Sequence, residues 1–137
     1  MLLSLCIIFK DEINYLPLAV ASCESLCDEF ILVDSGSSDG SGEWAQEKAA
    51  TDNRFKYFRR PWPGNFADQR NFAIDQAQGK WILSLDADEE LEEKAIPQIR
   101  EALQNPKADA FLLEIRNYTN DFTELGFRRS SERSGAA

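Results

Sequence analysis

Short apolar runs alternate along the chain with stretches of helical periodicity. The runs 2–9, 30–33, 55–58 and 81–85 have the length and the aliphatic or aromatic content of buried strands. Between them, apolar residues recur every three or four positions, as they do on one face of a helix. This alternation predicts an α/β fold of βαβ units, with a mostly parallel sheet flanked by helices on both faces.

The same pattern predicts helix ends and faces. Asn14 is the expected N-cap of the first helix and Asn65 that of the third, because a side-chain oxygen there accepts an N–H of the first turn. A fourth helix is expected to end before Pro106, and a fifth strand is predicted over 108–115. The third helix is expected to bury one face, made up of Phe66, Arg70, Ala73 and Ala77.

The 137 residues have the length of one domain, and their apolar fraction of 43% is ordinary for a globular protein. Residues 1–118 are predicted to form this domain, and 119–137 a loop and a loose tail. The apolar N-terminus is too short to span a bilayer and lacks the basic start of a signal peptide. We therefore expect a cytoplasmic protein without a transmembrane segment.

Charge and cysteine content argue against a nucleic-acid-binding surface and a zinc site. A net charge of −9 argues against nucleic acid as a partner, because phosphate backbones select basic surfaces. The chain has three cysteines, no histidine and no CxxC pair, which argues against a zinc site. An anionic ligand would need a cation to approach so acidic a protein.

Charged residues follow all four apolar runs. In parallel sheets, ligands bind beyond the carboxyl ends of the strands, which meet at one edge. A sheet with a purely structural role has no need to concentrate charge there. The residues brought to this edge are Asp11, Glu12, Asp34, Arg59, Arg60, Asp86 and Asp88.

Asp86 and Asp88 are spaced i, i+2 at the end of the run 81–85. Mg²⁺ and Mn²⁺ take oxygen ligands and bridge one or two carboxylates to substrate phosphates. The structural alternative is a solvated strand end that leads into an acidic helix start. Because Asp34 accompanies the pair, we favour a metal–diphosphate site in an enzyme that uses a nucleotide-activated donor.

Two further features suggest a nucleotide. The segment 34–40 does not match a calcium loop or a dinucleotide fingerprint, which leaves a capped turn or a nucleoside-binding edge with Asp34 accepting from a base N–H. Arg70, on the apolar side of its helix, needs an acidic or phosphate partner. Trp62 and Phe66 are expected to pack in the core or in a lid.

Four segments resemble family 2 glycosyltransferases with the GT-A fold, and most closely the bacterial lipopolysaccharide-core glucosyltransferase branch. They are SLCIIFKDE (4–12), ILVDSGSSDG (31–40), Arg70-Asn71 and LSLDADE (83–89), within a resemblance that covers about residues 2–118. It implies inverting transfer of a sugar from a nucleotide diphosphate, expected to be UDP-linked, to a glycan or glycolipid acceptor hydroxyl. It also implies peripheral association with the inner face of the inner membrane.

The resemblance also implies roles for single residues. The nucleobase and ribose pocket would be lined by Phe9, Asp11, Glu12 and Asp34, with Arg70 near the nucleotide, Asp86 at the ribose or metal shell, and Asp88 as the direct ligand of Mg²⁺ or Mn²⁺. Asp11 departs from the Asn usual in that branch. Such enzymes continue well beyond this chain, and neither Glu114 nor Glu124 lies in a recognisable general-base motif. We therefore expect the donor-binding N-terminal part.

Three other functions are compatible with parts of the pattern. A phosphatase of the haloacid-dehalogenase type also uses DxD, but on its first strand and followed by Thr or Val, where this chain has Glu90. A nucleotidyltransferase would carry a Gly-rich, basic loop after its first strand, unlike Lys10-Asp11-Glu12. A donor-binding module without its catalytic partner is the third.

Overall fold

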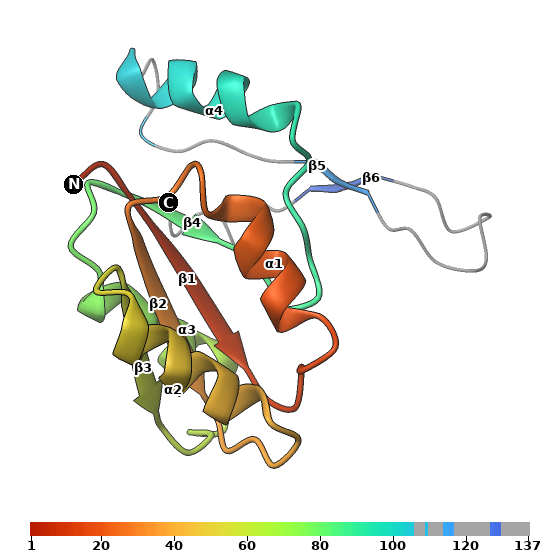
Figure 1. The fold of residues 1–137 in the computed structure, drawn as a ribbon. Helices are drawn as coiled ribbons and strands as arrows, with labels where there is room; N and C mark the ends of the chain where they lie inside the picture. The colour runs from red at the N-terminus through yellow and green to blue at the C-terminus, as the bar shows by residue number, and fades with distance from the viewer. Residues whose placement is uncertain (106–108, 110–113, 117–126, 130–137) are drawn as a thin grey trace.

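The computed structural model describes residues 1–105, 109, 114–116 and 127–129. Its main sheet consists of four strands in the order β3-β2-β1-β4, and every neighbouring pair is parallel. The strands are β1 (Leu3–Phe9), β2 (Glu29–Asp34), β3 (Phe55–Arg59) and β4 (Trp81–Ser84). The four predicted strands and their parallel arrangement are therefore confirmed (Figure 1).

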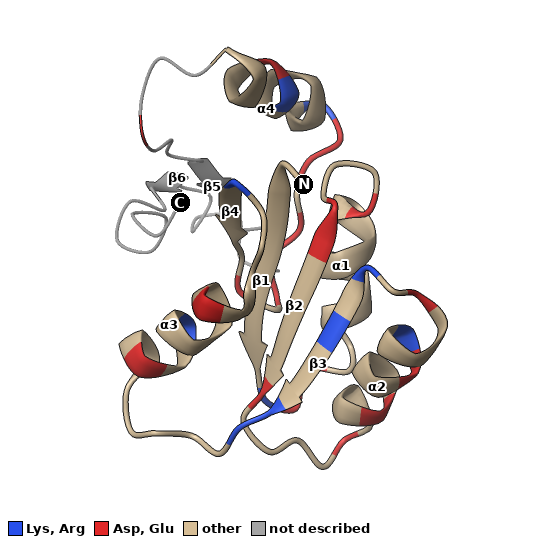
Figure 2. Ribbon diagram, turned by 90° about the vertical axis from the view of Figure 1, so that its left-hand side faces the viewer, with Lys and Arg blue, Asp and Glu red and all other residues tan. Residues whose placement is uncertain are grey.

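Helices cover both faces of this sheet, as predicted. Figure 2 shows α3 on one side and α1 and α2 on the other. The helices among the described residues are α1 (Leu16–Cys23), α2 (Ser41–Thr51), α3 (Phe66–Gln76) and α4 (Ala95–Gln104). Within the described part of the chain, no helix combines the length and the apolar content needed to cross a membrane.

Alternate residues of each strand feed two hydrophobic cores, because successive side chains point to opposite faces of a sheet. The larger core joins β1 and β2 to α1 and α2, and the Phe30 and Phe55 rings stack in it at 4.4 Å. The smaller core packs α3 on the other face. Its buried members are Cys6, Ile31, Val33 and Ala73. The strands are thereby fixed on both faces, and their carboxyl ends are held in a constant arrangement.

One expected helix cap is correct and one is wrong. Asn65 caps α3 and accepts the N–H of Asp68 at 2.8 Å. Asn14 does not cap α1, because the cap position falls at Tyr15 and no side chain accepts there. Instead, the carbonyl of Glu12 accepts the N–H of Tyr15 at 3.1 Å, so the backbone itself closes this turn.

The predicted fifth strand is confirmed only in part. Asp109 lies in a bend, whereas Glu114–Arg116 forms β5, which pairs antiparallel with β6 (Phe127–Arg129) and not with the main sheet. A strand at Phe127–Arg129 was not predicted within the expected loose tail. The remainder of both segments lies outside the described residues, and the boundary at residue 118 stays a prediction.

Candidate functional site

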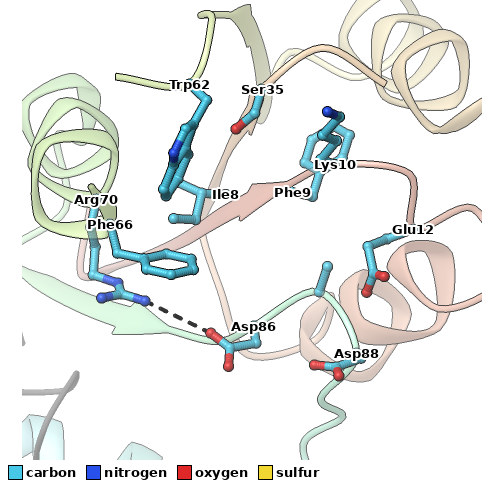
Figure 3. Close-up of a pocket in the computed structure, with 11 residues that line it drawn as sticks. Ile8, Phe9, Lys10, Glu12, Ser35, Trp62, Phe66, Arg70, Asp86 and Asp88 are labelled. Carbon is cyan, nitrogen blue, oxygen red and sulfur yellow. Dashed lines mark ion pairs between the residues drawn. The ribbon is translucent and has the colours of Figure 1, made fainter. Parts of the chain in front are cut away.

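An open cavity of about 730 Å³ lies at the carboxyl edge of the main sheet. This is the edge at which the sequence predicts a ligand. Side chains reach it from the ends of β1 and β4, the loops after β2 and β3, and α3 (Figure 3). Its lining consists of Ile8, Phe9, Lys10, Glu12, Ser35, Trp62, Phe66, Arg70, Asp86, Ala87 and Asp88.

A tight turn presents Asp86 and Asp88 to the cavity. The carbonyl of Asp86 accepts the N–H of Glu89 at 3.0 Å, and Glu89 Oε1 accepts the N–H of Asp86 at 2.7 Å. Ala87, between the two aspartates, is buried in the larger core and anchors the turn. The turn therefore brings two carboxylates to the cavity on either side of an alanine that also belongs to the larger core.

Glu12 adds a third carboxylate to this acidic side of the cavity, which consists of Glu12, Asp86 and Asp88 (Figure 3). Burial raises the pKa of Glu12, and the negative charges of Asp88, Asp39 and Asp86 raise it further. The shift shows that Glu12 lies in the field of both aspartates. A cation on this side would lower the repulsion among them.

The acidic side suits a hard divalent cation that shares its ligands with a phosphate. Mg²⁺ and Mn²⁺ are commonly held by one or two carboxylates together with substrate phosphates and water. Two cavity-lining carboxylates meet that requirement, whereas no group of three or more ligating side chains is found among the described residues. These carboxylates therefore fit an ion whose remaining ligands are phosphate oxygens or water.

Arg70 has the acidic partner that the sequence predicts for it. Its Nη2 lies 3.9 Å from Asp86 Oδ1, which joins α3 to the end of β4 (Figure 3). The predicted buried face of α3 is wrong at Phe66, which is 62% exposed, and Gln69 is buried with Ala73 instead. The helix is turned so that Phe66 and Arg70 border the cavity.

Gln69 is a site-supporting residue that the sequence analysis missed. Its side chain is fully buried between the loops that follow β2 and β3. Its Nε2 donates to Ser35 Oγ at 3.2 Å and to the Arg60 carbonyl at 2.7 Å, while its Oε1 accepts from Arg60 Nη1 at 2.5 Å. Nothing in the sequence marks this glutamine for such a role. The one indication is that it lies one helical turn before Ala73, on the buried face of α3.

Asp34 supports the site from behind and does not line the cavity. Its side chain is fully buried. Oδ1 accepts from the N–H groups of Gly36 and Ser37 and from the Ser37 hydroxyl, and Oδ2 accepts from the Tyr57 hydroxyl. Burial raises the pKa of Asp34, but these hydrogen bonds outweigh it and hold the pKa below its usual range. Direct contact of Asp34 with a base stays a prediction.

Asp11 also serves the loops behind the cavity. It adopts a left-handed backbone conformation (φ 53°), and its Oδ1 accepts the N–H of Ser38 at 2.7 Å. The N–H groups of residues 11–13 each donate to a side chain of the segment 37–41, namely to Ser37 Oγ at 2.8 Å, Ser41 Oγ at 3.2 Å and Asp39 Oδ2 at 3.1 Å. These three hydrogen bonds fix the loop that carries Lys10 and Glu12 into the cavity.

Of the residues predicted to contact the ligand, five line the cavity and two lie behind it. The five are Phe9, Glu12, Arg70, Asp86 and Asp88. Other lining residues were not predicted as site residues. Trp62 and Phe66, expected in the core or a lid, are exposed at the cavity, while Lys10 and Ser35 adjoin predicted residues.

Curated proteins with similar sequences are much longer than this chain. A TPR repeat-containing protein of Synechococcus elongatus is 43% identical over 108 residues, which cover 79% of this chain and 26% of that protein. The lipopolysaccharide core biosynthesis glycosyltransferase LpsC of Rhizobium meliloti is 36% identical over 97 residues, 71% of this chain and 35% of LpsC. The chain thus spans about a quarter to a third of these relatives.

Solved structures share the fold at low sequence identity. TarS 1–349 of S. aureus in complex with UDP aligns with a TM-score of 0.68 and 17% identity, over 88% of this chain and 37% of TarS. Its complex with UDP-GlcNAc gives a TM-score of 0.68 over 88% of this chain and 36% of TarS. The fold is therefore that of the GT-A glycosyltransferases, as the sequence resemblance implies. The profile of glycosyl transferase family 2 matches residues 4–135, and the chain belongs to that family.

Proposed function

We propose that this chain forms the donor-binding part of a glycosyltransferase. The enzyme would transfer a sugar from a nucleotide diphosphate, most simply a UDP-sugar, to an acceptor hydroxyl with inversion. The observation that carries this proposal is the convergence of Asp86, Asp88 and Glu12 on one open cavity at the carboxyl edge of a GT-A sheet. The complexes of TarS with UDP and UDP-GlcNAc support a nucleotide-sugar donor.

In this proposal the acidic side of the cavity binds the donor diphosphate through Mg²⁺ or Mn²⁺. Asp88 would be the direct ligand, with Asp86 in the metal shell or at the ribose. Once bound, the ion would neutralise charge that develops on the departing diphosphate. Arg70, 3.9 Å from Asp86, orients that carboxylate and places a positive charge beside the nucleotide.

The acceptor is proposed to be a glycan or glycolipid. LpsC, a lipopolysaccharide core biosynthesis glycosyltransferase that is 36% identical, supports lipopolysaccharide synthesis as the setting. An acceptor of this class would bring the protein to the cytoplasmic face of the bacterial inner membrane as a peripheral protein. We assign no general base among the described residues.

A donor-binding module without transferase activity is the second candidate. It would bind the donor in the same cavity and differ from the enzyme in lacking turnover. Incubation with UDP-glucose and UDP-GlcNAc in Mn²⁺ separates the two candidates. Release of UDP, with or without an acceptor, supports the enzyme, whereas donor binding without turnover supports the module.

The proposal is tested by calorimetric titration of UDP in the presence of Mn²⁺ and again in EDTA. We expect UDP to bind in Mn²⁺ and binding to be lost in EDTA. Asp88→Asn should remove the metal-dependent binding and leave the fold intact, because Asp88 is exposed at a turn. Asp75→Asn, an exposed carboxylate of α3 that does not line the cavity, is the matched control. If Asp88→Asn binds UDP and Mn²⁺ as tightly as the parent, the metal assignment is wrong.

A further inference from the structure

Two aromatic side chains are exposed on the wall of the cavity. Trp62 and Phe66, here called the aromatic pair, have 43% and 62% of their surface exposed and belong to neither hydrophobic core. Their ring centroids lie 4.8 Å apart with the ring planes 74° from parallel. Edge-on packing of this kind leaves ring faces open to a ligand, and large aromatic side chains that stay exposed in a cavity indicate binding.

The aromatic pair is held in place at both ends of its loop. On one side, the N–H of Arg60 donates to the carbonyl of Asp34 at 2.9 Å, at the carboxyl end of β2. On the other, Asn65 caps α3 by accepting the N–H of Asp68 at 2.8 Å, and this fixes the first turn, which carries Phe66. The rings are therefore positioned before any ligand arrives, which lowers the entropy lost on binding.

The aromatic pair extends from the wall opposite Asp88, where Trp62 lies, toward Asp86, beside which Phe66 lies. Figure 3 shows Trp62 across the cavity from Asp88, with Ile8 and Phe9 between them. Arg70 borders the aromatic pair and the acidic side, because its guanidinium lies over the Phe66 ring at 5.9 Å and Nη2 lies 3.9 Å from Asp86. The cavity thus offers an apolar, flat-faced side and a metal-binding side to one elongated ligand.

The chemistry of a nucleotide sugar decides which part meets the aromatic pair. The transferred sugar is bonded directly to the terminal phosphate, so it must stay beside a metal that holds the diphosphate. The base is separated from the diphosphate by the ribose and can reach the far wall. The position of Trp62 opposite Asp88 therefore matches the base and not the sugar, with Phe66 beside it.

We propose that Trp62 and Phe66 bind the nucleobase of the donor by stacking against its face. This inference rests on the proposed function, because the diphosphate must occupy the acidic side for the base to lie at the aromatic pair. Stacking is tolerant of the base, since every base has a π-face. The pair consequently supplies affinity for the nucleoside, and the choice among bases is made by polar groups elsewhere.

The test compares ligands with and without a base. The dissociation constants of UDP and of inorganic pyrophosphate, each with Mn²⁺, are measured for the parent, Trp62→Ala, Phe66→Ala and the double variant. We expect the double variant to bind UDP about tenfold or more weakly, as for the loss of one base–aromatic stack. Its affinity for pyrophosphate should be unchanged. Tyr15→Ala, which removes an aromatic ring that is 53% exposed and outside the cavity, is the matched control.

Each outcome is decisive. Trp62→Phe should retain most of the UDP affinity, because it keeps an aromatic face. If the double variant binds UDP within twofold of the parent, the stacking role is wrong and the metal–diphosphate site stands. Equal losses for UDP and pyrophosphate would also overturn stacking, since the pair would then support the diphosphate side. If the parent binds pyrophosphate but not UDP, or neither, the proposed function fails and stacking fails with it. Thermal unfolding of each variant confirms that the fold is retained.

Discussion

The hydroxyl of Tyr57 donates a 2.7 Å hydrogen bond to the fully buried carboxylate of Asp34. This bond joins β3 to the end of β2, where the turn that carries Ser35 into the cavity begins. Burial and the neighbouring carboxylate raise the pKa of Tyr57 to about 12, so its hydroxyl stays protonated and donates at neutral pH.

Tyr57→Phe should therefore destabilise the protein in a pH-dependent way. We expect a loss of about 2 kcal/mol at pH 7, because a buried carboxylate loses one donor. The pKa of Asp34 is lowered in the folded state, so its stabilising contribution is present above the ordinary Asp pKa of about 3.9 and is lost as pH falls through the folded value. The difference between parent and variant in urea unfolding should shrink below about pH 4. Tyr15→Phe, at an exposed position, should show no difference at either pH.

Gly42→Ala should destabilise the protein although alanine is the better helix former by about 1 kcal/mol. A Cβ at residue 42 would lie 2.6 Å from Asp34 Oδ2 and 3.2 Å from the Tyr57 hydroxyl oxygen, so the bond between these side chains must shift. In a Tyr57→Phe background the same change should cost less, because the crowded hydroxyl is gone. A double-mutant cycle measured by urea unfolding checks this coupling. Strict additivity would show that Gly42 is not packed against the pair.

Asp88→Asn should lower the pKa of Glu12 toward its ordinary value of 4.5. The charge of Asp88 follows burial among the causes that raise this pKa, and the substitution removes that charge. Because a raised carboxyl pKa opposes folding at neutral pH, the variant should be as stable as the parent or slightly more so. NMR titration of the Glu12 carboxyl group measures the shift. Added Mg²⁺ with UDP should lower this pKa in the parent and leave it unchanged in the variant.

Gln69→Leu should cost about 2 kcal/mol in the free energy of unfolding, because Ser35 and the Arg60 carbonyl lose the buried donor they share. Gln69→Glu should cost at least as much, since a carboxylate accepts from Arg60 but cannot donate to either oxygen. Urea unfolding with an unchanged m-value is the measurement. Gln46→Leu, on the exposed face of α2, is the control and should change little. A neutral effect of Gln69→Leu would mean that the two loops are held by other contacts.

The sheet was predictable from the sequence because parallel strands buried on both faces appear as short apolar runs. β1, β2 and β4 come from apolar runs, interrupted only by Ser4 and Ser84, that lead into charged residues, and their observed ends fall within one residue of the predicted ones. The face of α3 was not predictable in the same way. Phe66 is apolar but serves the cavity, while Gln69 is polar but fully buried with its hydrogen bonds satisfied. The apolar or polar character of these two residues therefore predicts the wrong burial, because Phe66 borders the cavity and Gln69 supports the loops around it.

The sequence predicted the position of the candidate site better than the role of each residue in it. Carboxylates at strand ends can hold a ligand or the N–H groups of a neighbouring turn, and sequence spacing does not distinguish these uses. Asp86 and Asp88 line the cavity, whereas Asp11 and Asp34 bind the backbone of the loops around it. Trp62 was expected in the core or in a lid, and the structure places it at the cavity and not in a core, a choice that aromatic content alone does not decide.

Neither Trp62 nor Phe66 contributes to the two cores on which folding depends. Selection for tighter or weaker nucleoside binding can therefore change these side chains without disturbing either core. Phe9 and Ala87 also line the cavity, but they belong to the larger core, so changing them would disturb its packing. Libraries restricted to positions 62 and 66 would thus vary the affinity for the nucleoside while the packing of both cores is preserved.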